Sequence, residues 1–380
     1  MLRAKFPTKH HFTISIFGCQ YHAQAPNAQK ADLVQKFDVL VRQQAIAVEE
    51  LEQNDIPSKI WMSYWESPQT FKSWWESADV KSFWNDLSDD AGFWRETVSL
   101  PATRSMFETN KDEPVGFGHC GKLIPLTAKH GYWGSYRSRM TPNTPEDKFS
   151  SPLDALPDPG PHKGQVRNGR IRMPNFPDNI CFVVEGQDYS AMSERERDYW
   201  DDNFDALAKQ WVTNVVTAGT SKGMVSARAC HAFAGNKQPD GTLRTAKTGV
   251  EGKHVSPHDM TNGPSIFPGL DYIRQAQILF WLDMSYMEHL GRYDKVHVKL
   301  RRDFMTAYSP GGDMEGGDLM LWVDVGILKA DEIDAEYVGC YEGTGFMAYE
   351  NHPQFQSKVM PSSVLPSFFD RPFESQPIEW

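Results

Sequence analysis

His297 is the residue whose type and surroundings point most directly to chemistry. Apolar residues recur at helical spacing before it, at Met287, Leu290, Tyr293 and Val296, and a valine stands on each side of it. An imidazole in an apolar wall is most simply a core histidine whose ring nitrogens are satisfied by neighbouring groups. A neutral imidazole in such a wall is also what a haem iron needs as a ligand. Both interpretations stay open at this point.

The stretch that carries His297 repeats one that occurs earlier in the chain. Residues 61–84 read as a strand, a capping serine, a proline and a helix, and residues 278–305 have the same order of strand, cap and helix. When the two stretches are aligned, His297 falls at the position of Lys81, 216 residues earlier. We therefore expect a duplicated domain whose second copy carries a histidine in place of a lysine.

Composition and charge exclude several classes of protein. The chain has 380 residues and a formal net charge of −11, which argues against nucleic acid or an anionic membrane as the partner. No apolar run approaches the roughly 20 residues of a membrane helix, and the first residues lack the apolar core of a secretory signal. Five cysteines are scattered without a CxxC pair, as expected of reduced thiols in a cytoplasmic protein. Twelve tryptophans and 22 phenylalanines suit a wide apolar pocket or a thick core.

Hydrophobic periodicity predicts strands and helices that alternate in both halves of the chain. The expected strands are 13–21, 60–65, 93–100, 179–184, 224–233, 278–282, 319–328 and 336–347. The expected helices are 28–53, 67–84, 193–217 and the segment that follows residue 285. This order predicts an α+β fold in which helices cover one face of a sheet.

Three regions complete the predicted organisation. Residues 1–175 are expected to form a first half that ends in an irregular connector (101–175) with some strand near 123–127. Residues 176–350 form the second half, with a long surface loop at 234–271, and residues 351–380 are an extended tail. The sequence contains no GxGxxG, Walker, HExxH or GxSxG motif.

Several segments, in order along the chain, resemble the aldoxime dehydratases, which are haem enzymes that convert aldoximes to nitriles. The matching stretches are SYWESPQTFKSWW (63–75), HGYWGSYRSRM (130–140), PDNICFVVEGQDYS (177–190), GMVS (223–226) and YVGCYEGTGF (337–346). The resemblance implies a pair of duplicated ferredoxin-like halves that form a dimeric α+β barrel, a homodimer, and haem b that is ferrous in the active form. It places the proximal haem ligand on His297 and a distal serine, which contacts the oxime hydroxyl, on Ser226.

The sequence departs from this family at two distal positions. Val184 stands where the family has an arginine, and Val323 where it has a histidine. The nearest acids, Glu185 and Asp324, are expected to point away from the face that their valine neighbours line. Tyr341 or water could supply a proton instead, with Val184, Val323 and Ser226 lining the substrate pocket. Arg137 and Arg139 suit haem propionates or solvent equally well.

These observations favour a haem-dependent lyase that dehydrates a small apolar aldoxime by cleaving its N–O bond. The two valines keep open a haem enzyme of the same fold that acts on another N-hydroxylated compound. A haem-binding protein without turnover and a barrel that holds no haem are the remaining alternatives.

Overall fold

The computed structural model describes residues 1–7, 9–53, 55–126, 136–140, 142, 144, 146–160, 164–232, 274–356 and 358–360. The predicted loop at 234–271 therefore lies outside the described residues. Within these ranges, no helix is both long and apolar enough to cross a membrane.

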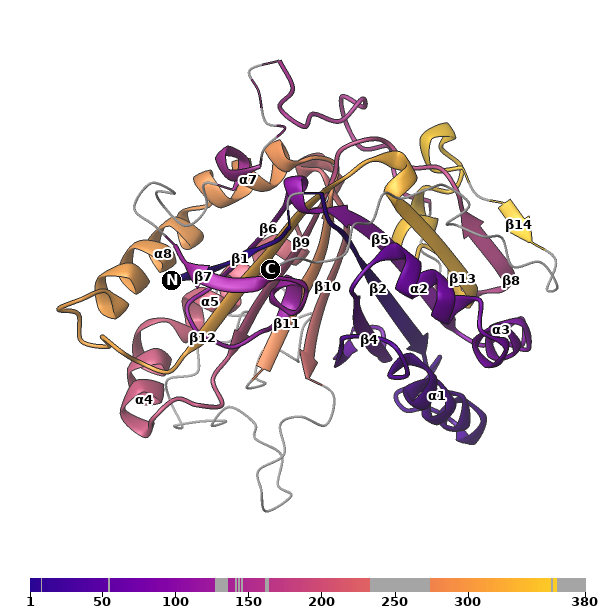
Figure 1. The fold of residues 1–380 in the computed structure, drawn as a ribbon, viewed down its shortest axis with the longest axis horizontal. Helices are drawn as coiled ribbons and strands as arrows, with labels where there is room; N and C mark the ends of the chain where they lie inside the picture. The colour runs from indigo at the N-terminus through magenta and orange to yellow at the C-terminus, as the bar shows by residue number, and fades with distance from the viewer. Residues whose placement is uncertain are drawn as a thin grey trace.

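One antiparallel sheet organises the described part of the chain (Figure 1). Its order is β14-β8-β13-β5-β2-β4-β3-β10-β11-β9-β12-β6-β1-β7. The strands are β1 Leu2–Lys5, β2 His11–Gln20, β3 Ala47–Gln53, β4 Ser58–Trp65, β5 Phe93–Pro101, β6 Ser105–Thr109, β7 Lys122–Pro125, β8 Val166–Met173, β9 Ile180–Asp188, β10 Met224–Ala232, β11 Arg274–Trp281, β12 Met320–Leu328, β13 Ile333–Tyr341 and β14 Lys358–Met360.

Two groups of helices flank the sheet. They are α1 Ala28–Val41, α2 Pro68–Trp75, α3 Ala78–Asn85, α4 Glu194–Asn203, α5 Asp205–Val216, α7 Met284–Tyr293 and α8 Lys295–Tyr308. In Figure 1 the helices α1 to α3 lie at the right and α4, α5, α7 and α8 at the left, with β2, β10 and β11 between the two groups. The first group covers β2 to β5 and the second covers β9 to β12.

The two groups of strands have the same internal order. Across the sheet, the first group has the order β3-β4-β2-β5 and the second has the order β10-β11-β9-β12. Along the chain, each group has one helical segment after its first strand (β2 or β9) and another after its third (β4 or β11). The groups meet where β3 pairs with β10, with Gln53 opposite Cys230. Two groups of strands with the same order therefore lie next to each other in the sheet.

The prediction of a single helix over 28–53 is wrong. The helix α1 ends at Val41, and Ala47–Gln53 is the strand β3. The letters AVEELEQ favour a helix by propensity, but this segment pairs with β4 on one side and β10 on the other. Tertiary pairing thus overrides local preference.

Several other boundaries differ from those expected. The predicted helix 67–84 is interrupted at Ser77, 193–217 at Phe204, and the helix that carries His297 at Asp294. The connector 101–175 contains β6 and β8 in addition to the short strand predicted near 123–127. The predicted strand 336–347 ends early, because β13 stops at Tyr341 and a short 3-10 helix follows at Gly345–Tyr349. The remaining predicted strands are confirmed to within about four residues at each end.

Alternation along the strands divides the core into layers. On β9, Phe182 and Val184 belong to a large core that includes residues from both strand groups, and we call this side the inner face. Cys181 and Val183 point to the opposite side, where they pack with side chains of α5, α7 and α8, and we call this side the helix face.

Candidate functional site

His297 lies in the first turn of α8, directly after the junction with α7. The Asp294 carboxylate caps α8 by accepting a hydrogen bond from the His297 backbone N–H at 2.9 Å. The ring nitrogen Nδ1 lies 2.6 Å from the Gly291 carbonyl oxygen. Because a carbonyl oxygen can only accept, Nδ1 carries the proton and donates it. The other nitrogen, Nε2, then keeps its lone pair for a ligand.

Two further features keep the His297 imidazole neutral and oriented. Burial lowers its pKa from the usual value, which favours the uncharged form that binds metals. The indole of Trp211 on α5 stacks on the ring, with centroids 4.1 Å apart and planes at 20°. The Trp211 Nε1–H in turn donates to a Glu185 carboxylate oxygen on β9 at 3.2 Å. Glu185, Trp211 and His297 therefore form one contact chain from the sheet to α8.

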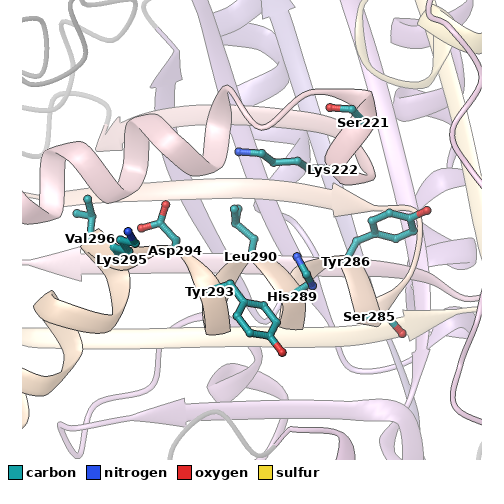
Figure 2. Close-up of a pocket in the computed structure, with 10 residues that line it drawn as sticks. All are labelled: Ser221, Lys222, Ser285, Tyr286, His289, Leu290, Tyr293, Asp294, Lys295 and Val296. Carbon is teal, nitrogen blue, oxygen red and sulfur yellow. The ribbon is translucent and has the colours of Figure 1, made fainter.

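A cavity of about 740 Å³ lies beside the α7–α8 junction. Figure 2 shows the turn with Ser221 and Lys222 on one side, and α7 with Tyr286 and Leu290 on the other. Its wall ends at Val296, the residue before His297. The lining combines apolar side chains with the charged or titratable groups of Lys222, Lys295, Asp294 and His289, and the cavity volume is typical of cofactor sites.

The predicted pocket residues divide between the two faces of the sheet. Val323 belongs to the helix face, together with the layer around α5, α7 and α8. Val184 belongs to the inner face, and it pairs with Asp324, whose carboxylate accepts the Phe117 N–H at 2.8 Å on that side. The valines are thus on different sides, because they stand one residue out of register across β9 and β12.

Ser226 also opens onto the inner face. It pairs with Phe280 of the inner core, just after a bulge between Met224 and Ser226. It lines a second cavity of about 290 Å³ with Trp94 and Arg228. The structure therefore brings His297 and Val323 to the helix face, and leaves Ser226 and Val184 across the sheet from them. The catalytic role of Ser226 stays a prediction.

The arginines suggested for propionates already have carboxylate partners. Arg137 pairs with Glu288 at 3.1 Å, and Arg139 pairs with Glu108. Tyr341 lies on β13 in a different part of the sheet, where its ring meets His22 edge-on with centroids 4.9 Å apart.

Sequence analysis did not assign roles to Glu185 and Trp211. Glu185 was expected to point away from the face that Val184 lines, and this is confirmed, since Glu185 lies opposite Val323 on the helix face. The alternation rule gives that orientation. Only strand pairing, however, brings Glu185 beside Val323, and only the packing of α5 adds Trp211.

The chain as a whole is similar to one group of enzymes. The family described as haem-containing dehydratase matches residues 15–346. A curated relative, the phenylacetaldoxime dehydratase of Bacillus sp. (strain OxB-1), is 25% identical over 313 residues, which cover 80% of this chain and 77% of the relative.

Two solved structures have the same fold. A crystal structure of an aldoxime dehydratase in complex with butyraldoxime has a TM-score of 0.69 at 18% identity, covering 91% of this chain and 88% of that chain. A second aldoxime dehydratase structure has a TM-score of 0.67 at 19% identity, covering 91% of this chain and 90% of that chain.

Proposed function

The chain belongs to the family of haem-containing dehydratases, and from this premise we propose that it converts an aldoxime to a nitrile with loss of water. Membership makes the protein a lyase with haem as its cofactor. The curated relative is named for phenylacetaldoxime, and one structural relative was crystallised with butyraldoxime. Those substrates belong to the relatives, and an aldoxime of similar apolar character is our proposal for this chain.

The residues around the α7–α8 junction fit a haem group. His297 offers a neutral imidazole whose Nδ1 is engaged by a backbone carbonyl, which leaves Nε2 for the iron. Apolar side chains of α7 and α8 line the neighbouring cavity, and Lys222 and Lys295 supply positive charge for the two propionates. The setting of His297 is the single observation that carries the proposal.

The reaction makes defined demands on the protein. An aldoxime, R–CH=N–OH, loses its N–O bond and its carbon proton to give R–C≡N and water. Bound ferrous haem supplies a site that holds the oxime nitrogen and weakens the N–O bond. The protein must orient the oxime, exclude water from it, and deliver a proton so that the oxygen leaves as water rather than hydroxide. A general acid contributes about 100- to 10,000-fold to such a step.

The test is an anaerobic visible spectrum of the purified protein, reduced with dithionite, before and after phenylacetaldoxime is added. We expect a Soret band that shifts with the oxime, and nitrile formed in the same cuvette. A Soret band without nitrile from phenylacetaldoxime or short alkyl aldoximes would overturn the proposed reaction.

A second candidate is cleavage of the N–O bond in another N-hydroxylated compound. Val323 supports it, since Val323 lies on the helix face with His297 and, by the resemblance, stands where the family has a polar distal histidine. Screening hydroxamic acids and N-hydroxyamines for haem-dependent turnover distinguishes this candidate from the first.

The strand orders also support a finer account of the fold. We propose that β2 to β5 and β9 to β12 are two ferredoxin-like halves of a duplicated α+β barrel, corresponding to residues 1–175 and 176–350 with a tail over 351–380. The strand β13 of the second half pairs with β5 of the first, so the halves share their sheet. A homodimer in the cytoplasm is part of the same proposal, and sedimentation of the purified protein tests its oligomeric state.

A further inference from the structure

A row of polar side chains crosses the helix face of the sheet. Strand register places Gln277 of β11 opposite Glu185 of β9, Glu185 opposite Val323 of β12, and Val323 opposite Glu108 of β6. Directly opposite residues on neighbouring strands point to the same face. The side chains of Gln277, Glu185 and Glu108 are thus aligned beneath the helices that carry Trp211 and His297. Polar side chains at such a buried surface cost free energy unless they are hydrogen-bonded.

The side-chain amide of Gln277 is buried and its nitrogen lacks a partner in the described part of the chain, which indicates that a ligand binds to it. Its side chain is 3% exposed, and its amide nitrogen Nε2 has no hydrogen-bond partner among the described residues. An amide donor left unpaired in a protein interior costs roughly 1–3 kcal/mol. A polar group of a bound molecule, placed beside Glu185, would satisfy that donor.

Glu185 is the carboxylic acid of this row that forms no ion pair within the described ranges and can exchange a proton. One carboxylate oxygen accepts the Trp211 Nε1–H, and its side chain keeps a partly exposed surface. Burial raises the pKa of Glu185 to about 7, against the opposing effect of the Trp211 hydrogen bond. A group with a pKa near neutrality exchanges protons efficiently in both directions at physiological pH. Glu108, in contrast, is paired with Arg139.

Ion pairs hold several other charged groups of the surrounding elements, namely Glu108 with Arg139, Glu288 with Arg137, and Lys209 with Asp205. Neither these groups nor Lys222 and Lys295 of the cavity are among the causes of the Glu185 pKa shift. His297 stacks on the face of the Trp211 indole, and burial lowers the pKa of His297, which favours its neutral form. The acidity of Glu185 is therefore governed by burial and by Trp211.

We propose that Glu185 is the acid–base residue of the dehydration, with Gln277 orienting the oxime hydroxyl beside it. This inference rests on the proposed aldoxime chemistry. The Trp211 ring contacts both Glu185 and His297, so one indole spans the distance between the acid and the iron ligand. Ser226, in contrast, lies on the inner face, across the sheet from His297.

The step balances without any added reactant. The Glu185 carboxylic acid gives its proton to the hydroxyl oxygen as the N–O bond breaks, and water leaves. The resulting carboxylate takes the proton from the oxime carbon as the C≡N bond forms, which restores the acid. The sum is R–CH=N–OH giving R–C≡N and water, with no net oxidation or reduction.

The decisive experiment compares the haem-loaded wild-type enzyme with Glu185→Gln, which keeps the shape and removes the acidic proton. Asp324→Asn is the matched control, since Asp324 is a buried acid with raised pKa on the next strand but faces the inner side. We expect Glu185→Gln to keep the Soret band and its shift with phenylacetaldoxime, while kcat falls about 100- to 10,000-fold. Asp324→Asn should keep kcat within a few fold.

A second readout does not depend on turnover. Infrared difference spectra of the wild-type protein should show a protonated carboxylic acid that titrates near neutral pH and is missing in Glu185→Gln. Equal kcat in wild type and Glu185→Gln would overturn the role of Glu185 and leave the proposed function intact. A wild-type enzyme that binds haem but yields no nitrile would overturn the proposed function and this inference together. Loss of the Soret band in Glu185→Gln, without a wild-type infrared titration, would make Glu185 structural.

Discussion

The indole of Trp211 lies nearly parallel to the imidazole of His297, with ring centroids 4.1 Å apart and planes at 20°. The contact joins α5 to α8, and the hydrogen bond from Trp211 to Glu185 extends it to the sheet. The iron ligand that we propose is therefore fixed from two sides, by this ring and by the Gly291 carbonyl.

Replacement of His297 by alanine should remove the axial ligand and with it the Soret band of the reduced protein. Added imidazole should restore part of the band, because the missing side chain leaves space for it. His352→Ala is the control, since His352 lies after the last strand of the second group and caps a short turn by accepting the Gln354 N–H. An unchanged Soret band in His297→Ala would rule out the ligand assignment.

Trp211→Phe should shift the pH dependence of the reaction upward. The Trp211 hydrogen bond favours the charged Glu185 carboxylate, so its loss raises the pKa of Glu185 above the wild-type value of about 7. Since the protonated acid is the reactive form in the free enzyme, kcat/KM falls as pH rises through this pKa. The falling limb should move to higher pH in Trp211→Phe.

Trp200→Phe provides the comparison for that shift. Trp200 is a buried tryptophan of α4 that packs on Tyr189 and Phe204 rather than on Glu185. Its replacement removes an indole without touching the proposed acid. A falling limb that stays in place in Trp211→Phe, or moves equally in both variants, would contradict control by this hydrogen bond.

Arg228→Met should destabilise the fold strongly. Arg228 is 4% exposed and pairs with both oxygens of Glu96, at 2.8 and 2.6 Å, on the inner face. Its removal leaves a buried carboxylate without its cation, which costs about 3–5 kcal/mol. Urea unfolding followed by circular dichroism measures the change. Arg302→Ala, which breaks an exposed pair with Asp303, should cost less than about 1 kcal/mol.

Gly223→Ala should disturb the wall of the larger cavity. Gly223 has φ of +75°, and a Cβ there would lie 2.3 Å from Cγ of Tyr286, a lining residue. Gly311→Ala is the matched control, with φ of +85° and nothing within 4 Å of its Cβ. Both substitutions destabilise the fold through the positive φ. The additional loss of unfolding free energy in Gly223→Ala, about 1–3 kcal/mol, therefore measures the clash with Tyr286. Equal unfolding free energies would show that the Tyr286 ring moves aside freely.

Much of the local structure follows from the sequence. The amino-acid sequence alone shows the order of strand, cap and helix around His297 and the repeat of that order 216 residues earlier. It also shows the resemblance to the aldoxime dehydratases. Local rules suffice there because caps and periodicity act over a few residues. The family match over residues 15–346 confirms the resemblance.

Tertiary structure decided which residues meet. Ala47–Gln53 becomes a strand because β4 and β10 pair with it, although its letters favour a helix. Val184 and Val323 were expected in one pocket, yet a register offset of one residue sends them to opposite faces of the sheet. The same register places Glu185 beside Val323, and α5 brings Trp211 between Glu185 and His297. Such partners are set by pairing and packing between distant segments, so no local pattern encodes them.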